Sequence, residues 1–152
     1  MMRSSIRHRQ PLQLFTVLLG LFLLGTVPAF ADDGTKTVFY NVTTDDSWSS
    51  GMALGQAAMA RKSGHDVVVF LNVRGVYLAD KGRALDVFSG TGKDAHHMIA
   101  DLKAAGARII ICPMCMKKAG LTEADLVDGV ELGGPKVTFP LMTGDDTVVI
   151  SY

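Results

Sequence analysis

The chain has 152 residues, with 15 basic and 15 acidic side chains, and 48% of its residues are hydrophobic. This length allows one folded domain built around one hydrophobic core. Because no excess of lysine and arginine and no basic patch is present, the composition argues against nucleic-acid binding.

Residues 1–31 have the pattern of an export signal, with a basic start at residues 3–9, an apolar run at residues 14–24 and an A-x-A ending at Ala31. The apolar run is too short to span a membrane. We therefore predict a signal peptide cleaved after Ala31 and a periplasmic or secreted product without a membrane attachment. The alternative, an uncleaved anchor, is disfavoured by the A-x-A ending. The remaining domain, residues 32–152, has 12 basic and 15 acidic side chains, a net charge of −3.

Alternating strands and helices are predicted over the first part of this domain, because short β-branched runs alternate with stretches that start at capping residues. Helical spacing favours a core position for the methionines Met52, Met59 and Met98. In chain order, the predicted elements are a strand over 37–42, a helix over 48–62, a strand over 66–73, a helix over 95–105 capped by Asp94, and a strand over 108–111.

The predicted elements after Gly120 are shorter. They are a capping box at 122–125 that opens a short helix, a strand over 129–132, a brief helix over 139–143 that starts near Pro140, and a last strand over 146–151. Since strands and helices alternate, we predict an α/β fold with a mostly parallel sheet covered by helices on both faces.

The only two cysteines of the chain, Cys112 and Cys115, follow the apolar strand over 108–111. Pro113 suits the first position of a helix, which makes Cys112 the N-cap, and Gly120 suits the C-terminal end of that helix. Reactive groups in open α/β sheets lie beyond the carboxyl ends of the strands. A helix N-terminus lowers the pKa of a thiol below about 8.5, which favours a nucleophile or a soft metal ligand. A C-x-x-C spacing at this junction argues against the alternative of two cysteines that merely pack.

Other polar residues have weaker claims to a site. His96 and His97 are adjacent on a helix and point about 100° apart, so a solvated face is favoured over a metal pair. His97 and Asp101 have the spacing of a surface ion pair. Asn72 is expected at the same sheet edge as Cys112, either lining the site or forming a turn. The same two alternatives apply to Arg74 and Tyr77.

Several segments resemble the DsrE/DsrF-like family of sulfur-relay proteins. Residues 70–79 resemble its strand followed by G-V-Y-L-A, and residues 101–112 resemble its L-K-x-x-G-hydrophobic-C run; the segments 126–129 and 148–152 are also similar. The resemblance implies a three-layer α/β/α domain with a central sheet of about five strands, assembled as a homotrimer or homohexamer. It also implies that the cysteine eight residues before a glycine, here Cys112 before Gly120, carries sulfur as a persulfide. Cys115 and the export signal depart from the cytoplasmic relay members.

Three functions agree with these features. The first is a sulfur carrier that uses Cys112, with Cys115 able to resolve the persulfide, and that exchanges sulfur with donor and acceptor proteins without a cofactor. The second is a soft-metal protein, in which Cys112, Cys115, Met114 and Met116 provide thiolate and thioether ligands for Cu(I), with sites shared between subunits. The third is a thiol–disulfide redox protein, although thioredoxin-like folds carry their motif after an early strand. The first two describe a carrier or a binding protein rather than a turnover enzyme.

Overall fold

The computed structural model describes residues 34–152. The predicted leader, residues 1–31, and its cleavage after Ala31 lie outside the described residues. Within the described part, no helix is both long enough and apolar enough to cross a membrane.

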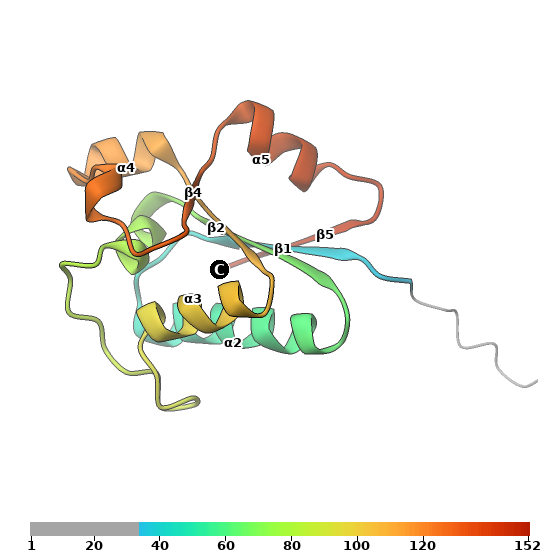
Figure 1. Cartoon of the computed structure of the whole chain (residues 1–152), viewed down its shortest axis with the longest axis horizontal. Helices are drawn as coiled ribbons and strands as arrows, with labels where there is room; N and C mark the ends of the chain where they lie inside the picture. Colours follow the sequence, from blue (N-terminus) through green and yellow to red (C-terminus); the bar gives the residue numbers. More distant parts are fainter. Residues whose placement is uncertain (1–33) are drawn as a thin grey trace, which may run out of the picture. The chain divides into compact units, whose positions relative to one another are not determined.

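Five strands form one parallel sheet in the order β4-β3-β2-β1-β5 (Figure 1). The strands are β1 (Thr37–Val42), β2 (Asp66–Leu71), β3 (Arg108–Ile111), β4 (Glu131–Leu132) and β5 (Thr147–Ser151). The helices are α2 (Ser47–Lys62), α3 (Ala95–Ala104), α4 (Pro113–Ala119) and α5 (Pro135–Met142), with the 3-10 helices η1 (Val73–Ala79) and η2 (Glu123–Asp125).

Helices cover both faces of the sheet. Figure 1 shows α2 and α3 side by side on one face and α5 on the other. Since β4 and β5 form opposite edges, the chain returns across the sheet between them, and α5 lies on that return. The α/β prediction, with about five mostly parallel strands between two helical layers, is confirmed.

The central strands are buried because both of their faces meet apolar layers. Phe39, Val68 and Ile110 form the core under α5, together with apolar residues of that helix. Alternate residues of the same strands, such as Val69 and Ile111, join the larger core that includes α2 and α3. Full burial of each such side chain contributes about 1.5–3 kcal/mol to the free energy of unfolding.

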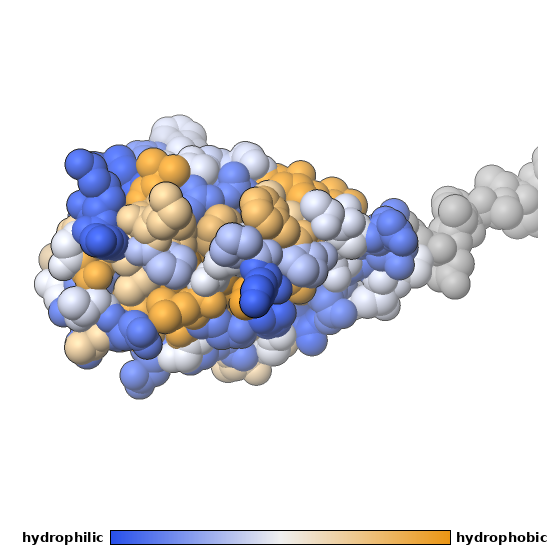
Figure 2. Space-filling model, turned by 90° about the horizontal axis from the view of Figure 1, so that it is seen from above, coloured by the Kyte–Doolittle hydropathy of each residue, from blue (hydrophilic) through white to orange (hydrophobic). Residues whose placement is uncertain are grey.

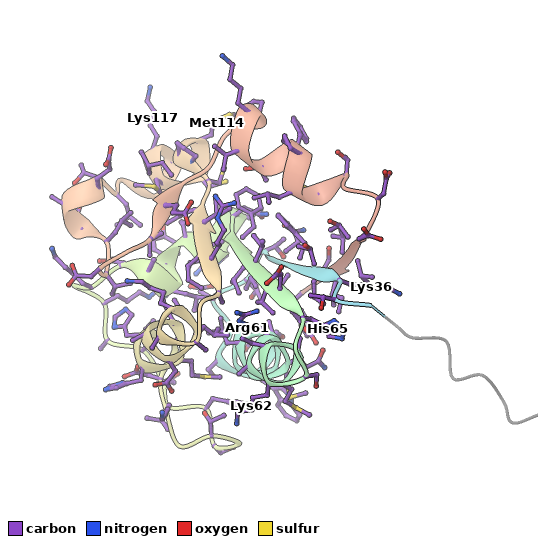
Figure 3. The ribbon with its side chains drawn as sticks, turned by 45° about the vertical axis from the view of Figure 1, so that its right-hand side comes forward. Lys36, Arg61, Lys62, His65, Met114 and Lys117 are labelled. Carbon is purple, nitrogen blue, oxygen red and sulfur yellow. The ribbon has the colours of Figure 1, made fainter. Side chains whose placement is uncertain are left out.

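Polar side chains fix the helix ends. Asp46 accepts a hydrogen bond from the Ser49 N–H at 2.9 Å and so caps α2. At the other end of α2, Arg61 donates to the carbonyl oxygens of Ala105, at 2.7 Å, and His65, at 2.8 Å. Arg61 therefore joins two loops at the amino edge of the sheet (Figure 3).

Three element predictions need correction. Strand β2 ends at Leu71 rather than residue 73, because the chain turns directly into η1. Helix α5 begins at Pro135 rather than near residue 139; it contains Pro140 and is held by its apolar packing against the sheet. Strand β4 covers only residues 131–132.

The methionines of the helices differ from one another in burial. Met98 is buried, at 5% exposure, as its spacing predicted. Met52 is 39% exposed and Met59 is 68% exposed, so the core prediction is wrong for these two. They lie on the side of α2 that faces away from the sheet, where helical spacing alone does not distinguish an inner stripe from an outer one.

Candidate functional site

The two cysteines lie beyond the carboxyl edge of the sheet. All strands run parallel, so their carboxyl ends meet at one edge. The Cys112 N–H donates to the Leu71 carbonyl at 2.9 Å, and the Asn72 N–H donates to the Val42 carbonyl at 3.0 Å. The predicted placement of Cys112 and Asn72 at the same edge is therefore confirmed.

Cys112 caps helix α4. Its Sγ accepts a hydrogen bond from the Cys115 N–H at 3.4 Å, and its carbonyl accepts the Met116 N–H at 2.9 Å. Pro113 occupies the first turn, and Gly120 ends the helix with φ +77°, a left-handed conformation suited to glycine. The local structure predicted around the cysteines is confirmed. The Cys112 sulfur therefore faces the first turn of the helix.

Cys115 lies in different surroundings from Cys112. Both are free thiols of intermediate burial. Burial raises the pKa of the Cys115 thiol above its ordinary value, the nearby Cys112 thiol adds to this rise, and a hydrogen bond from the Val73 N–H opposes it. The expectation of a lowered thiol pKa at this helix start is therefore wrong for Cys115. Helix α4 has only seven residues, and removal of water from the sulfur outweighs the effect of its N–H groups.

Val73 has an unusual backbone at this site. Its φ is +49°, and it is the only residue other than glycine with a positive φ in the part of the chain that the structure describes. A β-branched residue is strained there. The next two N–H groups hold the turn, from Arg74 to the Thr43 carbonyl at 3.0 Å and from Gly75 to the Asn72 carbonyl at 2.7 Å.

Gly75 brings η1 close to the end of β1. A Cβ atom at this position would lie 2.2 Å from the Val42 carbonyl oxygen, so no larger residue fits without movement. Sequence reasoning did not identify Val73 as a site residue, because nothing in the valine type signals a positive φ. The glycine two residues later was the only local signal of a tight turn.

A row of polar side chains continues from the site along the sheet edge. The Asn72 side-chain amide donates to the Asn41 side-chain oxygen, and the Asn41 amide donates to the Ser151 hydroxyl at 3.2 Å. These residues lie at or just beyond the ends of β2, β1 and β5. Asn72 therefore both borders the site and holds neighbouring strand ends together. Asn41 was not identified from the sequence.

Arg74 and Tyr77 belong to a separate cluster that fastens the loop before α2 to η1. Arg74 donates two hydrogen bonds to the Asp45 carboxylate, at 2.7 and 2.8 Å, and Arg83 donates a third at 2.7 Å. Both guanidinium groups lie over the Tyr77 ring, at 5.4 and 4.5 Å from its centre. The hydrogen bonds from Arg74 lower the pKa of Asp45. These contacts give Arg74 and Tyr77 a structural role.

The structure separates the four predicted metal ligands. Met114 is 82% exposed, and Figure 3 places it with Lys117 on the outer side of α4. Met116 is 4% exposed and packs in the hydrophobic core. Among the described residues, no three histidine, cysteine or acidic side chains gather around a common point. Of the proposed set, only Cys112 and Cys115 are joined by a contact, from the Cys115 N–H to the Cys112 Sγ.

The histidines of α3 do not form a pair. The His97 Nδ1 atom lies 2.8 Å from the Asp94 carboxylate, which also accepts the His97 N–H at 3.0 Å. Asp101, the predicted partner of His97, instead pairs with Lys93. The prediction was wrong because the N-cap carboxylate is already fixed beside His97 by the helix start.

Comparison with known proteins identifies the fold. The model of the DsrE/DsrF-like family matches residues 36–149. The YchN protein from E. coli superposes with a TM-score of 0.66 at 23% identity, covering 78% of this chain and 100% of that one. A protein of unknown function from Methanobacterium thermoautotrophicum, MTH1491, superposes with a TM-score of 0.57 at 16% identity, and the match covers 77% of this chain and 99% of that one. No curated protein sequence matches the chain. At these identities, the two solved structures support the fold alone.

Proposed function

The chain belongs to the DsrE/DsrF-like family, and we propose that it is a sulfur carrier that holds a sulfane sulfur as a persulfide on Cys112. One observation carries the proposal: Cys112 lies at the carboxyl edge of the sheet, partly accessible, with its Sγ accepting the Cys115 N–H. This placement supplies a sulfur that a donor protein can approach and an N–H group that fixes its position. On the predicted export signal, we place this activity in the periplasm or outside the cell.

Loading exchanges one sulfur–sulfur bond for another. The Cys112 thiolate attacks the terminal sulfur of a donor persulfide, the new bond to Sγ forms, and the donor's own sulfur–sulfur bond breaks. The donor leaves as a thiolate, so no external oxidant is needed. An acceptor protein takes the sulfur by the reverse exchange. The partners in this proposal are therefore a donor and an acceptor protein, without a cofactor.

Cys115 gives a second way to release the sulfur. Its thiolate attacks Cys112 Sγ, the sulfane sulfur leaves as hydrosulfide, and a Cys112–Cys115 disulfide remains. A dithiol reductant then restores both thiols before another cycle. Because burial raises the pKa of Cys115, a smaller fraction of this thiol is ionised than of an ordinary cysteine, which slows premature release.

We also propose that the carrier is a homo-oligomer, a trimer or a hexamer as the family resemblance implies. Apolar side chains exposed at the edges and outer helices support a subunit contact: Phe139 is 59% exposed, Val148 is 45% exposed and Leu132 is 38% exposed. Figure 2, which views the molecule from the side of α4 and α5, shows apolar surface among polar residues. Contacts of this composition are typical of subunit interfaces.

The test is the intact mass of the purified protein after incubation with a small-molecule persulfide. We expect a gain of one sulfur mass in the original protein and in Cys115→Ser, and none in Cys112→Ser. The Met114→Leu variant, altered on the exposed side of α4, serves as the control and should load normally. Failure of the original protein to gain sulfur, or equal loss from both cysteine variants, contradicts the proposal.

The same measurement distinguishes the two alternatives. Stoichiometric copper that both cysteine variants lose would favour a Cu(I) protein with the two thiols as ligands. A mass lower by two hydrogens in the original protein, together with no sulfur gain in Cys115→Ser, would favour a thiol–disulfide redox protein, because Cys115→Ser cannot release sulfur by forming the internal disulfide. In either case, the persulfide proposal would be abandoned.

A further inference from the structure

A groove of about 480 Å³ runs between α2 and the loop and helix that include residues 88–101. Three of the six methionines in the described residues line it: Met52 and Met59 from α2, and Met98 from α3. None of its lining residues comes from β3 or α4. The groove is therefore separate from the cysteine site.

The exposure of the α2 methionines calls for an explanation. Met52 is 39% exposed and Met59 is 68% exposed, although burial of such a side chain is favourable. Between them lies Gly55, where an added Cβ atom would meet nothing within 4 Å. The helix thus presents two thioethers on either side of an open hollow, rather than a packed apolar ridge.

The third sulfur faces a hydroxyl group. The Thr91 hydroxyl oxygen lies 3.6 Å from the Met98 Sδ atom and 3.4 Å from the Phe88 carbonyl oxygen, so this sulfur faces the loop over residues 88–93. A thioether sulfur has two lone pairs, so one remains for another partner. Met98 itself is 5% exposed, so it forms a buried side of the groove while Met52 and Met59 form an exposed one.

The groove offers few donors other than thioethers. Its one carboxylate, Asp101, is paired with Lys93. The remaining cation, Lys62, lies at the end of α2 and is exposed, so its ammonium group extends into water. No imidazole lines the groove, and its other side-chain oxygen donors are the Gln56 amide and the Thr91 hydroxyl, both neutral, whereas hard divalent ions favour several carboxylate oxygens. Thioether sulfur selects soft ions, Cu(I) above all.

We propose that Met52, Met59 and Met98 form a binding site for one soft monovalent cation of the Cu(I) class. Seven residues separate Met52 from Met59, a rise of about 10.5 Å along the helix. Three rotatable bonds allow each methionine side chain to bend over the hollow at Gly55. Thioethers carry no proton to lose, so this site binds its ion without proton release, unlike the thiols of Cys112 and Cys115.

The test uses Ag(I) as a redox-stable probe of Cu(I) sites. The purified protein carries Cys112→Ser and Cys115→Ser, which removes both thiols, and ¹³C-labelled methionine methyl groups are followed by NMR. We expect the signals of Met52, Met59 and Met98 to shift and to saturate at one ion per chain. The signals of Met114 and Met116 should not move. If these two signals stay unchanged, Ag(I) binds specifically at the groove and not to exposed thioethers in general.

Leucine replacements locate the ligands without changing side-chain volume greatly. Met52→Leu and Met59→Leu should each weaken Ag(I) binding by at least about tenfold. Loss of a residue that only supports a metal ligand already weakens binding by about this factor, and loss of a ligand itself should weaken it at least as much. Met114→Leu is the matched control, since it removes the most exposed methionine outside the groove. Circular dichroism checks that each variant is folded.

Two results would overturn the inference. The first is the absence of a shift at the three groove methionines when several equivalents of Ag(I) are present. The second is an equal effect of Met114→Leu and Met59→Leu on the affinity. Because both cysteines are absent from the tested protein, either result leaves the persulfide proposal for Cys112 untouched.

Discussion

Replacement of Val73 by glycine tests whether the cysteine site stores backbone strain. The left-handed conformation costs a residue with a Cβ about 1–2 kcal/mol, which glycine regains. Two effects oppose this gain. The Val73 side chain is 60% exposed, so the glycine loses only about two-fifths of the burial value of a valine, about 0.6–1.2 kcal/mol. The greater freedom of the unfolded chain costs a further 0.4–1 kcal/mol or so.

The free energy of unfolding of Val73→Gly should therefore differ from that of the original protein by no more than about 1 kcal/mol. Val76→Gly is the matched control, because Val76 lies in the same 3-10 helix, is fully buried and has a negative φ. Val76→Gly relieves no backbone strain, so its free energy of unfolding should fall by about 2–4 kcal/mol. The contrast between the two valines therefore measures the strain.

The assay is urea unfolding followed by far-UV circular dichroism. This signal is preferred because the only tryptophan, Trp48, is 75% exposed and reports poorly on the core. Val73→Ala keeps the Cβ atom, so it loses the methyl groups without relieving the backbone strain. Comparison with Val73→Gly therefore separates these two effects. If Val73→Gly destabilises the protein as much as Val76→Gly does, the strained backbone is not a property of this site and the reasoning fails.

Three further predictions concern the site and its supports. Because burial raises the pKa of Cys115, alkylation of this thiol in Cys112→Ser should have a midpoint above about pH 8.5, the ordinary value for a cysteine; a lower midpoint would show a stabilised thiolate instead. Asp45→Asn should lower the free energy of unfolding by about 1–2 kcal/mol, less than a buried charged hydrogen bond because one guanidinium partner is exposed. Since the pKa of Asp45 is lowered in the fold, its contribution is complete above about pH 3.9 and is lost as the pH falls through the folded value; a difference between the two proteins that stays constant down to pH 2 or so would contradict this. Gly75→Ala should cost towards the upper end of about 1–3 kcal/mol in urea unfolding, because its Cβ would lie 2.2 Å from the Val42 carbonyl oxygen; a neutral effect would show that η1 can move.

The cysteine turn could be predicted in detail because its signals are local. Proline at the first helical position, a cap before it and Gly120 after it each constrain the backbone at their own position. The parallel order of the strands then placed Asn72 beside Cys112, since consecutive parallel strands end at the same edge. These parts of the site needed no knowledge of distant contacts.

The features that could not be predicted depend on residues far apart in the chain. The pKa of Cys115 rises because of burial beside η1, and helix-dipole reasoning considers only the helix itself. The turn at Val73 is held by the Arg74 N–H, which donates to the Thr43 carbonyl in the loop after β1, and the valine type carries no sign of this contact. Pro140 lies inside α5 because packing against the sheet outweighs the local preference of proline for a helix start.

Helix α4 has a single buried residue, Met116, and only two turns. Its attachment to the domain is therefore weak compared with that of the central strands, and it should open locally at a small fraction of the free energy of global unfolding. In hydrogen exchange, the amides of α4 should exchange well before those of β3. A partner protein can thus reach Cys115 by lifting one short helix, while the strand that positions Cys112 stays folded. Access to the Cys115 thiol then depends on the fraction of time that α4 is open, and a docking partner is able to change this fraction.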